Sequence, residues 1–433
     1  MLIMVSSIQM DLWSPKRQQI RQLLNFNFFN IIVNKMEFKI TKKANLFTLV
    51  LLSVGLLFTI IGILVELKHD HGHHLGQRLS ANLLVDSFFF FGIGLGALFF
   101  LALQYATETG WYASVKRVIE AVAGFLPVGI ILLIVTLLII TLQNGAHIYL
   151  WMDSNVVAHD EIIKGKSSYL NKPFFWLRTI VYLSTYFIYW RGFKKRSLEE
   201  DVIGGTDIHY TNYKKAAVFL VFFAVFSSTS SWDWIMSIDV HWFSTLFGWY
   251  VFAGMWCTTM IVLVTLTLYL KKQGHLPNVN ESHIHDLGKW TFAISFLWSY
   301  LWFSQFMLIW YANIGEEVTY YITRIKDFKF MYFGMFLINF TLPMILLMSR
   351  DAKRHAGILT FVGLIAISGH WVDVYIMIMA GSMGKSAFIG FMEIGLLLTV
   401  LGIFLRVILK NLTKAPLSVV NHPYLDESIH HEI

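Results

Sequence analysis

The residues of this chain that could do chemistry are ionisable side chains that lie inside or beside long apolar segments. The clearest group lies between Ser227 and Trp249, where Asp233, Asp239 and His241 are interspersed with tryptophans. Charged groups are costly to place near hydrocarbon, and tryptophan favours the membrane–water interface. The stretch is therefore typical either of an aromatic anchor with ordinary loop polars or of a site for an amphipathic ligand.

The composition indicates a protein that crosses a membrane several times. Of 433 residues, 56% are hydrophobic and only 14% are charged, whereas soluble domains carry roughly a quarter charged residues. The formal charge of +7 indicates membrane orientation and not a nucleic-acid partner. The single cysteine, Cys257, excludes an internal disulfide, a Cys-ligated iron–sulfur cluster and covalently attached haem c.

Ten apolar segments are long enough to span a bilayer, since about 20 helical residues cross a 30 Å hydrocarbon core. The sequence predicts an all-α membrane protein with about ten transmembrane helices, at 45–65, 80–106, 116–142, 173–191, 213–231, 243–270, 288–311, 329–349, 356–379 and 386–409. Pro127 and Pro343 are expected to interrupt two of them. Lys and Arg are most concentrated in alternate loops, above all between Arg191 and Lys215, so both termini are predicted to be cytoplasmic.

Three parts of the chain are expected. Residues 1–36 form an N-terminal extension, either an over-long start or an interfacial arm, and contain no signal-peptide pattern. Residues 37–415 form the membrane domain, and residues 416–433 form a polar C-terminal tail. The stretch from His69 to His74 contains four histidines and is interpreted as a solvated outer loop, with metal binding as the less favoured alternative.

The predicted topology places several ionisable residues near the outer face. Asp86 is either a hydrated interfacial carboxylate or a proton acceptor near a bound headgroup. Glu393, about two turns into its span, is either part of a proton path or paired with Arg178 or a similar cation. His147, just beyond a span, is a loop residue, a proton acceptor or, least favoured, a haem ligand.

Two further features lie within spans. His370 and Asp373 are three residues apart on one helix face, so they could relay a proton or form a structural hydrogen bond. Gly92, Gly94 and Gly96 occupy alternate positions of one span. They are interpreted as sites of close helix packing, because no strand precedes them and a nucleotide-binding loop is implausible there.

Three stretches resemble known membrane proteins. Ser80–Ala121 (SANLLVDSFFFFGIGLGALFFLALQYATETGWYASVKRVIEA) resembles the second and third helices of NrfD-like, polysulfide-reductase-type membrane subunits. Asp160–Arg178 (DEIIKGKSSYLNKPFFWLR) and Ser230–Gly254 (SSWDWIMSIDVHWFSTLFGWYVFAG) resemble the second such subunit, the ActF type, of bacterial alternative complex III. The resemblance covers about residues 37–415.

The resemblance implies a fold of two four-helix bundles and two peripheral helices, in a multi-pass protein of the bacterial inner membrane. It implies a place in a quinol:cytochrome c oxidoreductase beside a sister NrfD-like subunit, an iron–sulfur subunit, c-type cytochrome subunits and, in some assemblies, a terminal oxidase. Haem c and iron–sulfur clusters then belong to the partners, quinone is the one cofactor this chain could bind, and the chain alone is not catalytic. The segment QNGAHIYLWMD, with only His147, departs from the denser histidine motif of the family.

Three functional hypotheses follow. In the first, Asp86, His147, Asp233, Asp239 and His241 line an outer cavity that receives protons from quinol. In the second, the protein is a proton-coupled carrier that uses Glu393 and Asp373. In the third, it is a structural anchor whose loops bind partner subunits. None of them assigns a catalytic residue or a metal site to this chain.

Overall fold

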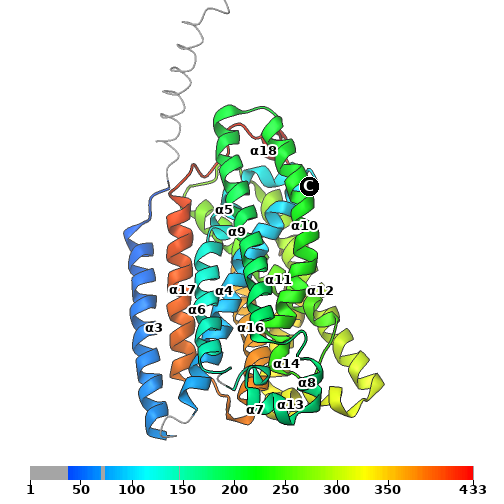
Figure 1. Cartoon of the computed structure of the whole chain (residues 1–433). Helices are drawn as coiled ribbons and strands as arrows, with labels where there is room; N and C mark the ends of the chain where they lie inside the picture. The colour runs from blue at the N-terminus through cyan, green and yellow to red at the C-terminus, as the bar shows by residue number, and fades with distance from the viewer. Residues whose placement is uncertain (1–37, 70–73, 146, 433) are drawn as a thin grey trace, which may run out of the picture.

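The structure, a computed structural model, describes residues 38–69, 74–145 and 147–432. The predicted extension 1–36 and most of the histidine-rich stretch lie outside the described residues. Long helices run along the molecule (Figure 1), and the described ranges contain helices and loops without strands. The long helices are α3 (Lys42–His69), α4 (Leu75–Ala106), α5 with α6 (Lys116–Ala123, Leu126–Leu142), α9 (Lys172–Ile203), α10 (Asp207–Trp234), α11 (Leu246–Lys272), α12 (Glu281–Ala312), α14 with α15 (Lys329–Phe336, Leu342–Leu346), α16 (Ala356–Ser382) and α17 (Phe391–Leu412).

Nine helices in the described part of the chain are long and apolar enough to cross a membrane. The all-α membrane architecture is therefore confirmed. The tenth predicted segment, 173–191, is the first part of α9, which is 32 residues long. α9 falls outside the nine because Arg178 interrupts its apolar part and charged residues fill its last three turns.

Two spans are interrupted next to their prolines, as the sequence predicted. α5 ends at Ala123 and α6 begins at Leu126, with Pro127 in its first turn. A π-helical turn, η5 (Leu337–Thr341), separates α14 from α15, where Pro343 stands in the first turn. Proline has no N–H for the helical hydrogen bond, so a chain with an interior proline stays helical only through such local readjustment.

Helix α4 is the centre of the molecule. Of the residues in its most apolar 18-residue stretch, 94% are buried. The helix contacts α5, α6, α10, α11, α16 and α17. A Cβ on Gly94 would lie 3.2 Å from the backbone nitrogen of Leu126, and one on Gly96 would lie 2.2 Å from Oγ1 of Thr259. The predicted role of these glycines in close helix packing is confirmed.

The remaining helices form two groups around α4. One group contains α5–α6, α9 and α10, which contact one another or α4; the other contains α11, α12, α14–α15 and α16. The groups meet where α4 and α10 pack against α11 and where α4 packs against α16. α3 and α17 lie together at one edge (Figure 1).

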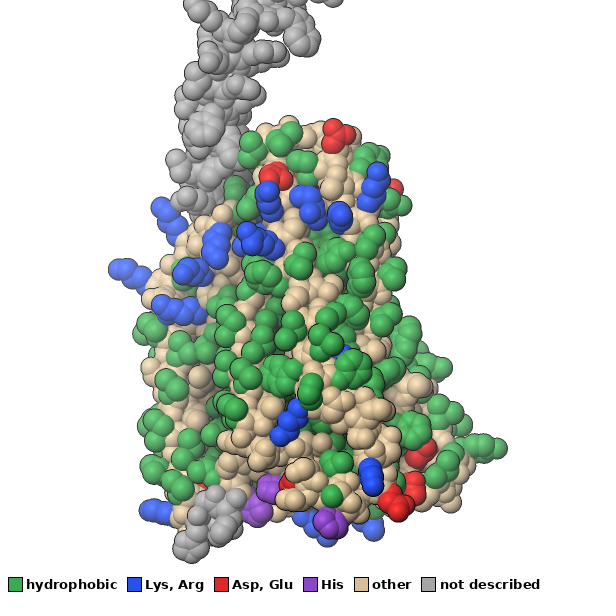
Figure 2. All heavy atoms as spheres, in the orientation of Figure 1, with side chains coloured by type: hydrophobic (Ala, Val, Ile, Leu, Met, Phe, Trp, Pro, Cys, Tyr) green, Lys and Arg blue, Asp and Glu red, His purple; other side chains and the backbone are tan. Residues whose placement is uncertain are grey.

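The two ends of the bundle differ in charge. Lys and Arg side chains gather at the end that holds α18 (Leu425–Ile429) and the C-terminus (Figures 1 and 2). The opposite end holds the short helices α7 (Ser154–His159), α8 (Glu161–Gly165) and α13 (Gly315–Asp327). By the positive-inside rule the basic end is predicted to face the cytoplasm; it is called the basic end below, and the other the outer end.

The α3–α17 pair depends on small residues at its contact. A Cβ on Gly395 would lie 2.3 Å from the backbone nitrogen of Thr59, and one on Gly62 would lie 2.5 Å from that of Met392. Backbones approach this closely only where neither helix presents a side chain. Outward-facing Leu and Ile side chains leave much of α3 exposed to its surroundings, so this seam is its main attachment.

Gly395→Ala is expected to destabilise the protein, because a methyl group at this seam has no room without separating the helices. Overpacking of this kind costs about 1–3 kcal/mol, which should appear as a lower apparent Tm of the detergent-solubilised chain. Gly334→Ala is the matched control, since nothing lies within 4 Å of that position in α14 and alanine favours a helix. Equal Tm values for the two variants would contradict the proposed seam.

Candidate functional site

Asp233 forms a buried ion pair at the outer end of the bundle. It lies in the last turn of α10 and accepts hydrogen bonds from Arg178 Nε at 2.7 Å and Nη2 at 2.8 Å. Tyr182 donates a third bond at 3.2 Å, and the Arg178 guanidinium lies over the ring of Tyr169, 3.8 Å from its centroid. This two-pronged geometry is the strong form of a carboxylate–arginine contact, and it joins α9 to α10.

Asp239 forms the second ion pair, with Arg324 of α13, at 2.9 Å. The Arg324 guanidinium also donates to the carbonyl of Met377 in α16 at 3.3 Å and lies 3.3 Å from the ring centroid of Tyr320. Trp242 stacks on the ring of Tyr320, with the two ring centroids 3.8 Å apart. Burial raises the pKa of Tyr320, so its hydroxyl stays protonated.

His241 contributes a third contact, at a more exposed position. Its Nε2 lies 2.6 Å from Oδ2 of Asp160, the residue that caps the N-terminus of α8. The backbone N–H of Ile163, together with the His241 ring, holds the pKa of Asp160 below its ordinary value. The carboxylate is thus ionised and fixed in direction, and it connects the outer loop to the Ser227–Trp249 stretch.

The Ser227–Trp249 stretch therefore connects several elements at the outer end. Its three ionisable residues reach three different elements: α9, α13 and the start of α8. Lys166 adds a bond from Nζ to the carbonyl of Val240 at 2.5 Å. These contacts favour the interpretation as a structural turn, and its ionisable residues do not line the two cavities beside Asp373.

Asp373 is the carboxylate that does border open space. It is 2% exposed in α16, accepts a short hydrogen bond from the Tyr250 hydroxyl and accepts another from Trp298 Nε1 at 3.0 Å. His370 does not bond to it directly: its Nδ1 lies 3.4 Å from Nδ2 of Asn339. The Trp298 ring lies between the two, edge-on to His370 at 5.3 Å.

Two cavities meet at Asp373. The first is a small, partly open space between α11, α12, α13, α14 and α16. The second is a similar space between α4, α11 and α16 and also reaches His370. The first is lined mainly by aromatic and polar side chains, which are Tyr250, Trp302, Gln305, Tyr320, Tyr321, Arg324, Tyr332, Met335, Asp373, Ile376 and Met377.

Asp86 and Glu393 are both buried, each with its own partners. Asp86 is 1% exposed and accepts from Trp371 Nε1 at 2.8 Å, so the alternative of a hydrated interfacial carboxylate is wrong. Glu393 stands in the first turn of α17 and not two turns in, because the helix begins only at Phe391. Its ion pair is with Arg78, through two bonds of 2.8 Å, whereas Arg178 is committed to Asp233.

The five residues expected to share one outer cavity lie apart. Asp86 is in the interior beside α16, and Asp233, Asp239 and His241 point to three different elements. His147 has a left-handed backbone conformation with φ of 57°, and its carbonyl accepts from Gln77 at 3.5 Å. The sequence assigned each of them to a segment, but not the direction in which its side chain points.

Several residues of the site escaped the sequence reading. Arg324 lies between the predicted spans 288–311 and 329–349, where the alternation of charged and apolar residues over Gly315–Asp327 is that of an amphipathic helix. Arg78 stands four residues before Asn82 on one helix face, a pattern that could have identified it as a partner for a buried acid. Tyr250 and Trp298 carry no such signal, since aromatic residues are frequent throughout the chain.

Comparison with known proteins adds no identification. No family model matches the chain, and a search of curated proteins finds no similar sequence. What is shown is a multi-pass, all-helical membrane protein with a polar, ion-paired outer end.

The Arg178–Asp233 pair gives a direct test of this interpretation. Arg178→Met leaves the fully buried Asp233 without its cation, and breaking a buried pair in this way costs about 3–5 kcal/mol. The double variant Arg178→Met/Asp233→Asn should recover part of the lost apparent Tm, because no unpaired charge remains. Lys195→Ala, which removes a largely exposed pair with Glu199, should change Tm little; a similar loss in all three variants would contradict the buried pair's role.

Proposed function

We propose that this chain is an integral membrane subunit of a respiratory quinol:cytochrome c oxidoreductase of the alternative complex III type. In this proposal it supplies a scaffold for partner subunits and a proton route, or a quinol-contacting surface, around Asp373. Partner subunits carry the haem c and iron–sulfur centres. The single observation that carries the proposal is Asp373, a buried carboxylate bonded to Tyr250 and Trp298 where two cavities meet.

The resemblance of three sequence stretches supports this proposal, and their positions add to it. The stretches Asp160–Arg178 and Ser230–Gly254 are bonded to each other at both ends, through Asp160–His241 and Arg178–Asp233. Two segments that resemble the same subunit type thus make up one joined surface at the outer end. Such a surface, rigid and rich in aromatic side chains, suits the binding of partner subunits.

Quinol oxidation explains why a buried acid beside a cavity would be useful. The reaction releases two protons for every two electrons, so the site needs groups that accept protons and an exit to water. Asp373 can accept a proton, and the first cavity extends from it to Tyr320 and Arg324. Arg324 in turn pairs with Asp239, whose side chain is 25% exposed, so this chain of polar groups ends at the outer surface.

The alternative hypotheses differ in how the structure bears on them. A proton-coupled carrier based on Glu393 would have to break its bonds to Arg78, Asn82 and the Gly390 backbone, which fix the carboxylate at a helix end. A purely structural anchor agrees with the ion-paired outer end and assigns no ligand to the Asp373 cavities. The anchor is therefore the second candidate.

Purification from native membranes tests the assignment to a complex. With an affinity tag on the full chain, we expect a c-type cytochrome and an iron–sulfur protein to copurify, visible by haem staining and mass spectrometry. Membranes that lack the chain should lose quinol:cytochrome c activity. Isolation as a single polypeptide, with normal quinol oxidation in the deletion strain, would reject the proposal.

Asp373→Asn tests the proton route separately. The amide keeps an acceptor for Trp298 Nε1 but cannot take up a proton, so quinol turnover of the assembled complex should fall at least about tenfold, the lower range of general-base effects. Glu316→Gln is the matched control, because Glu316 lies exposed in the first turn of α13. Unchanged turnover in an intact Asp373→Asn complex would favour the structural anchor.

A further inference from the structure

A second polar cluster lies at the basic end, where the sequence predicted a basic loop and a polar tail. Lys116 pairs with Glu200 at 2.5 Å, and Arg117 pairs with both Glu120 and Asp201. These five side chains are at most 10% exposed. Lys116 bonds only Oε2 of Glu200, so the other oxygen of this buried carboxylate, Oε1, has no cation or donor on it in the part of the chain that the structure describes, which is costly in a buried place.

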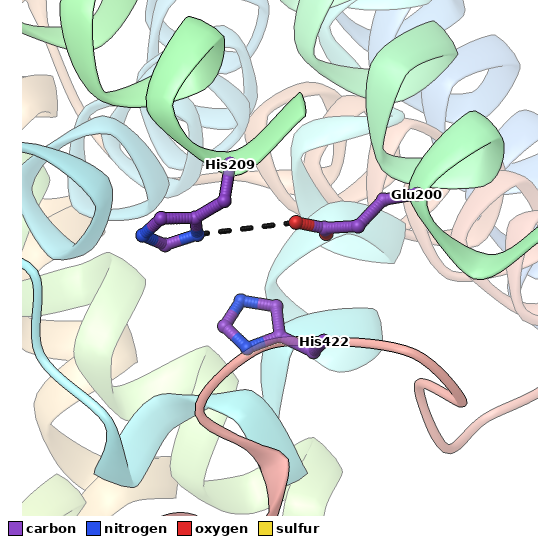
Figure 3. Close-up of side chains that lie close together, drawn as sticks. All are labelled: Glu200, His209 and His422. Carbon is purple, nitrogen blue, oxygen red and sulfur yellow. Dashed lines mark ion pairs between the residues drawn. The ribbon is translucent and has the colours of Figure 1, made fainter. Parts of the chain in front are cut away.

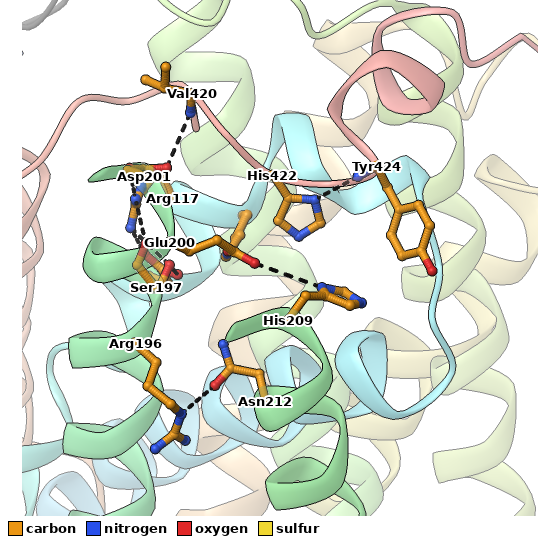
Figure 4. Close-up of polar contacts among 12 residues, drawn as sticks. Arg117, Arg196, Ser197, Glu200, Asp201, His209, Asn212, Val420, His422 and Tyr424 are labelled. Atoms are coloured by element: carbon orange, nitrogen blue, oxygen red, sulfur yellow. Dashed lines mark hydrogen bonds and ion pairs between the residues drawn. The ribbon is translucent and has the colours of Figure 1, made fainter. Parts of the chain in front are cut away.

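The C-terminal tail closes over this cluster. The backbone N–H of Val420 donates to Oδ1 of Asp201 at 3.2 Å (Figure 4), and Asn421 Nδ2 donates to the Asp201 carbonyl at 2.8 Å. These two bonds set the next residue, His422, above Glu200 and His209. His422 is 4% exposed, so this part of the tail is an element of the packed structure.

Glu200, His209 and His422 converge on one point. Each offers a ligand atom, and these atoms all lie within 4.8 Å of one another; Figure 3 shows the three side chains directed into a common space. Among the described residues, Oε1 of Glu200 and both ring nitrogens of His209 find no hydrogen-bond partner although they are buried. The nearest approach, from His209 Nδ1 to Glu200, is 3.9 Å, which is too long for a hydrogen bond.

Buried polar atoms that lack partners call for an explanation, and a bound ion is one that fits a convergent set of ligand atoms. We propose that Glu200, His209 and His422 bind a divalent transition-metal ion of the Zn²⁺ type. Two imidazoles and one carboxylate form a known three-ligand zinc set that leaves one position for water. The positive charge of the ion would also stabilise the Glu200 carboxylate, whose Oε1 has no partner within the described ranges.

The geometry requires only a small contraction. Ligand atoms about 2.0–2.1 Å from a tetrahedral zinc lie roughly 3.3 Å apart, so separations of up to 4.8 Å must close by at most about 1.5 Å. Lys116 occupies Oε2 of Glu200 and leaves Oε1 for the ion. Nδ1 of His422 accepts a bond from the Tyr424 N–H at 3.2 Å. Nε2 faces the other ligands (Figure 3) and lies 3.4 Å from the Tyr112 hydroxyl, a contact that the ion would replace.

Metal binding would change the hydrogen bond that the Tyr424 backbone N–H makes to His422. An ion on Nε2 requires the ring proton on Nδ1, which can then no longer accept from Tyr424. The ion would thus break the local Tyr424 bond. In its place it would link the tail to the end of α9 and the start of α10. Such a site fastens the tail to the membrane domain, and it does not depend on the function proposed above.

The first test measures metal content in the full-length chain, purified with a peptide tag that contains no histidine. The background carries glutamine at His69, His71, His73 and His74, because that stretch is a second source of metal ligands. After equilibration with Zn²⁺ and gel filtration, we expect about one ion per chain. His422→Gln and His209→Gln should lower the affinity for Zn²⁺ at least tenfold, since even an outer-shell change costs 10–100-fold.

His430→Gln is the matched control, because His430 is an exposed histidine of the same tail and should leave the zinc content unchanged. The His422→Gln variant keeps the test valid if His209→Gln fails to fold, since its change lies in the tail outside the helices. Amide exchange at residues 418–422 should increase when the ion is chelated, whereas exchange of the Tyr424 N–H, which then bonds to His422 Nδ1 again, should slow. Equal zinc content in the His422→Gln and His430→Gln variants, meaning an adventitious ion only, or no stoichiometric zinc in the background chain, would overturn the proposal.

Discussion

Compensation of buried charge is the constraint on which the arrangement of this protein depends. A helix that carries Arg178 or Arg78 inside an apolar bundle is stable only if a partner meets the guanidinium there, because an unpaired charge in low dielectric costs several kcal/mol. Each of these arginines is met by a carboxylate from a distant part of the sequence, Asp233 and Glu393 respectively. The pairs therefore determine which helix ends can lie side by side, and a bundle with another neighbour order would leave charges unpaired.

In the apolar middle of the bundle, small residues determine which helices pack together. Between helices in lipid, hydrophobic burial gives little preference, and close contact depends on shape. Gly94 and Gly96 admit α6 and α11 to α4, and Gly62 and Gly395 join α3 to α17. Charge pairs at the helix ends and glycine contacts in the middle thus favour the same packing. Such agreement between different kinds of interaction is expected of a foldable sequence.

Sequence reasoning located the helices well and predicted the direction of their side chains poorly. The apolar segments, the prolines at 127 and 343 and the packing glycines could be located because length, missing N–H groups and absent side chains act locally. The partner of Glu393 could not be predicted, since Arg78 is 315 positions away in the chain and only the direction of both helices around their axes brings them together. The group of Glu200, His209 and His422 escaped for the same reason, because its members come from two helix ends and a polar tail.

Buried charges are compensated differently at the two ends of the bundle. At the outer end, Arg178, Asp233, Asp239 and Arg324 all belong to helices or to the turns between them, so their pairs form whenever the bundle itself forms. At the basic end, the bonds to Asp201 and the closure over Glu200 depend on residues 420–422, which follow the last long helix. Buried Leu417 and Val419 hold the tail as well, but this segment belongs to no long helix, so it can open locally while the bundle stays folded. Under the two proposals above, the outer end serves as a lasting contact with partner subunits, and the basic end as a contact that a bound ion can change.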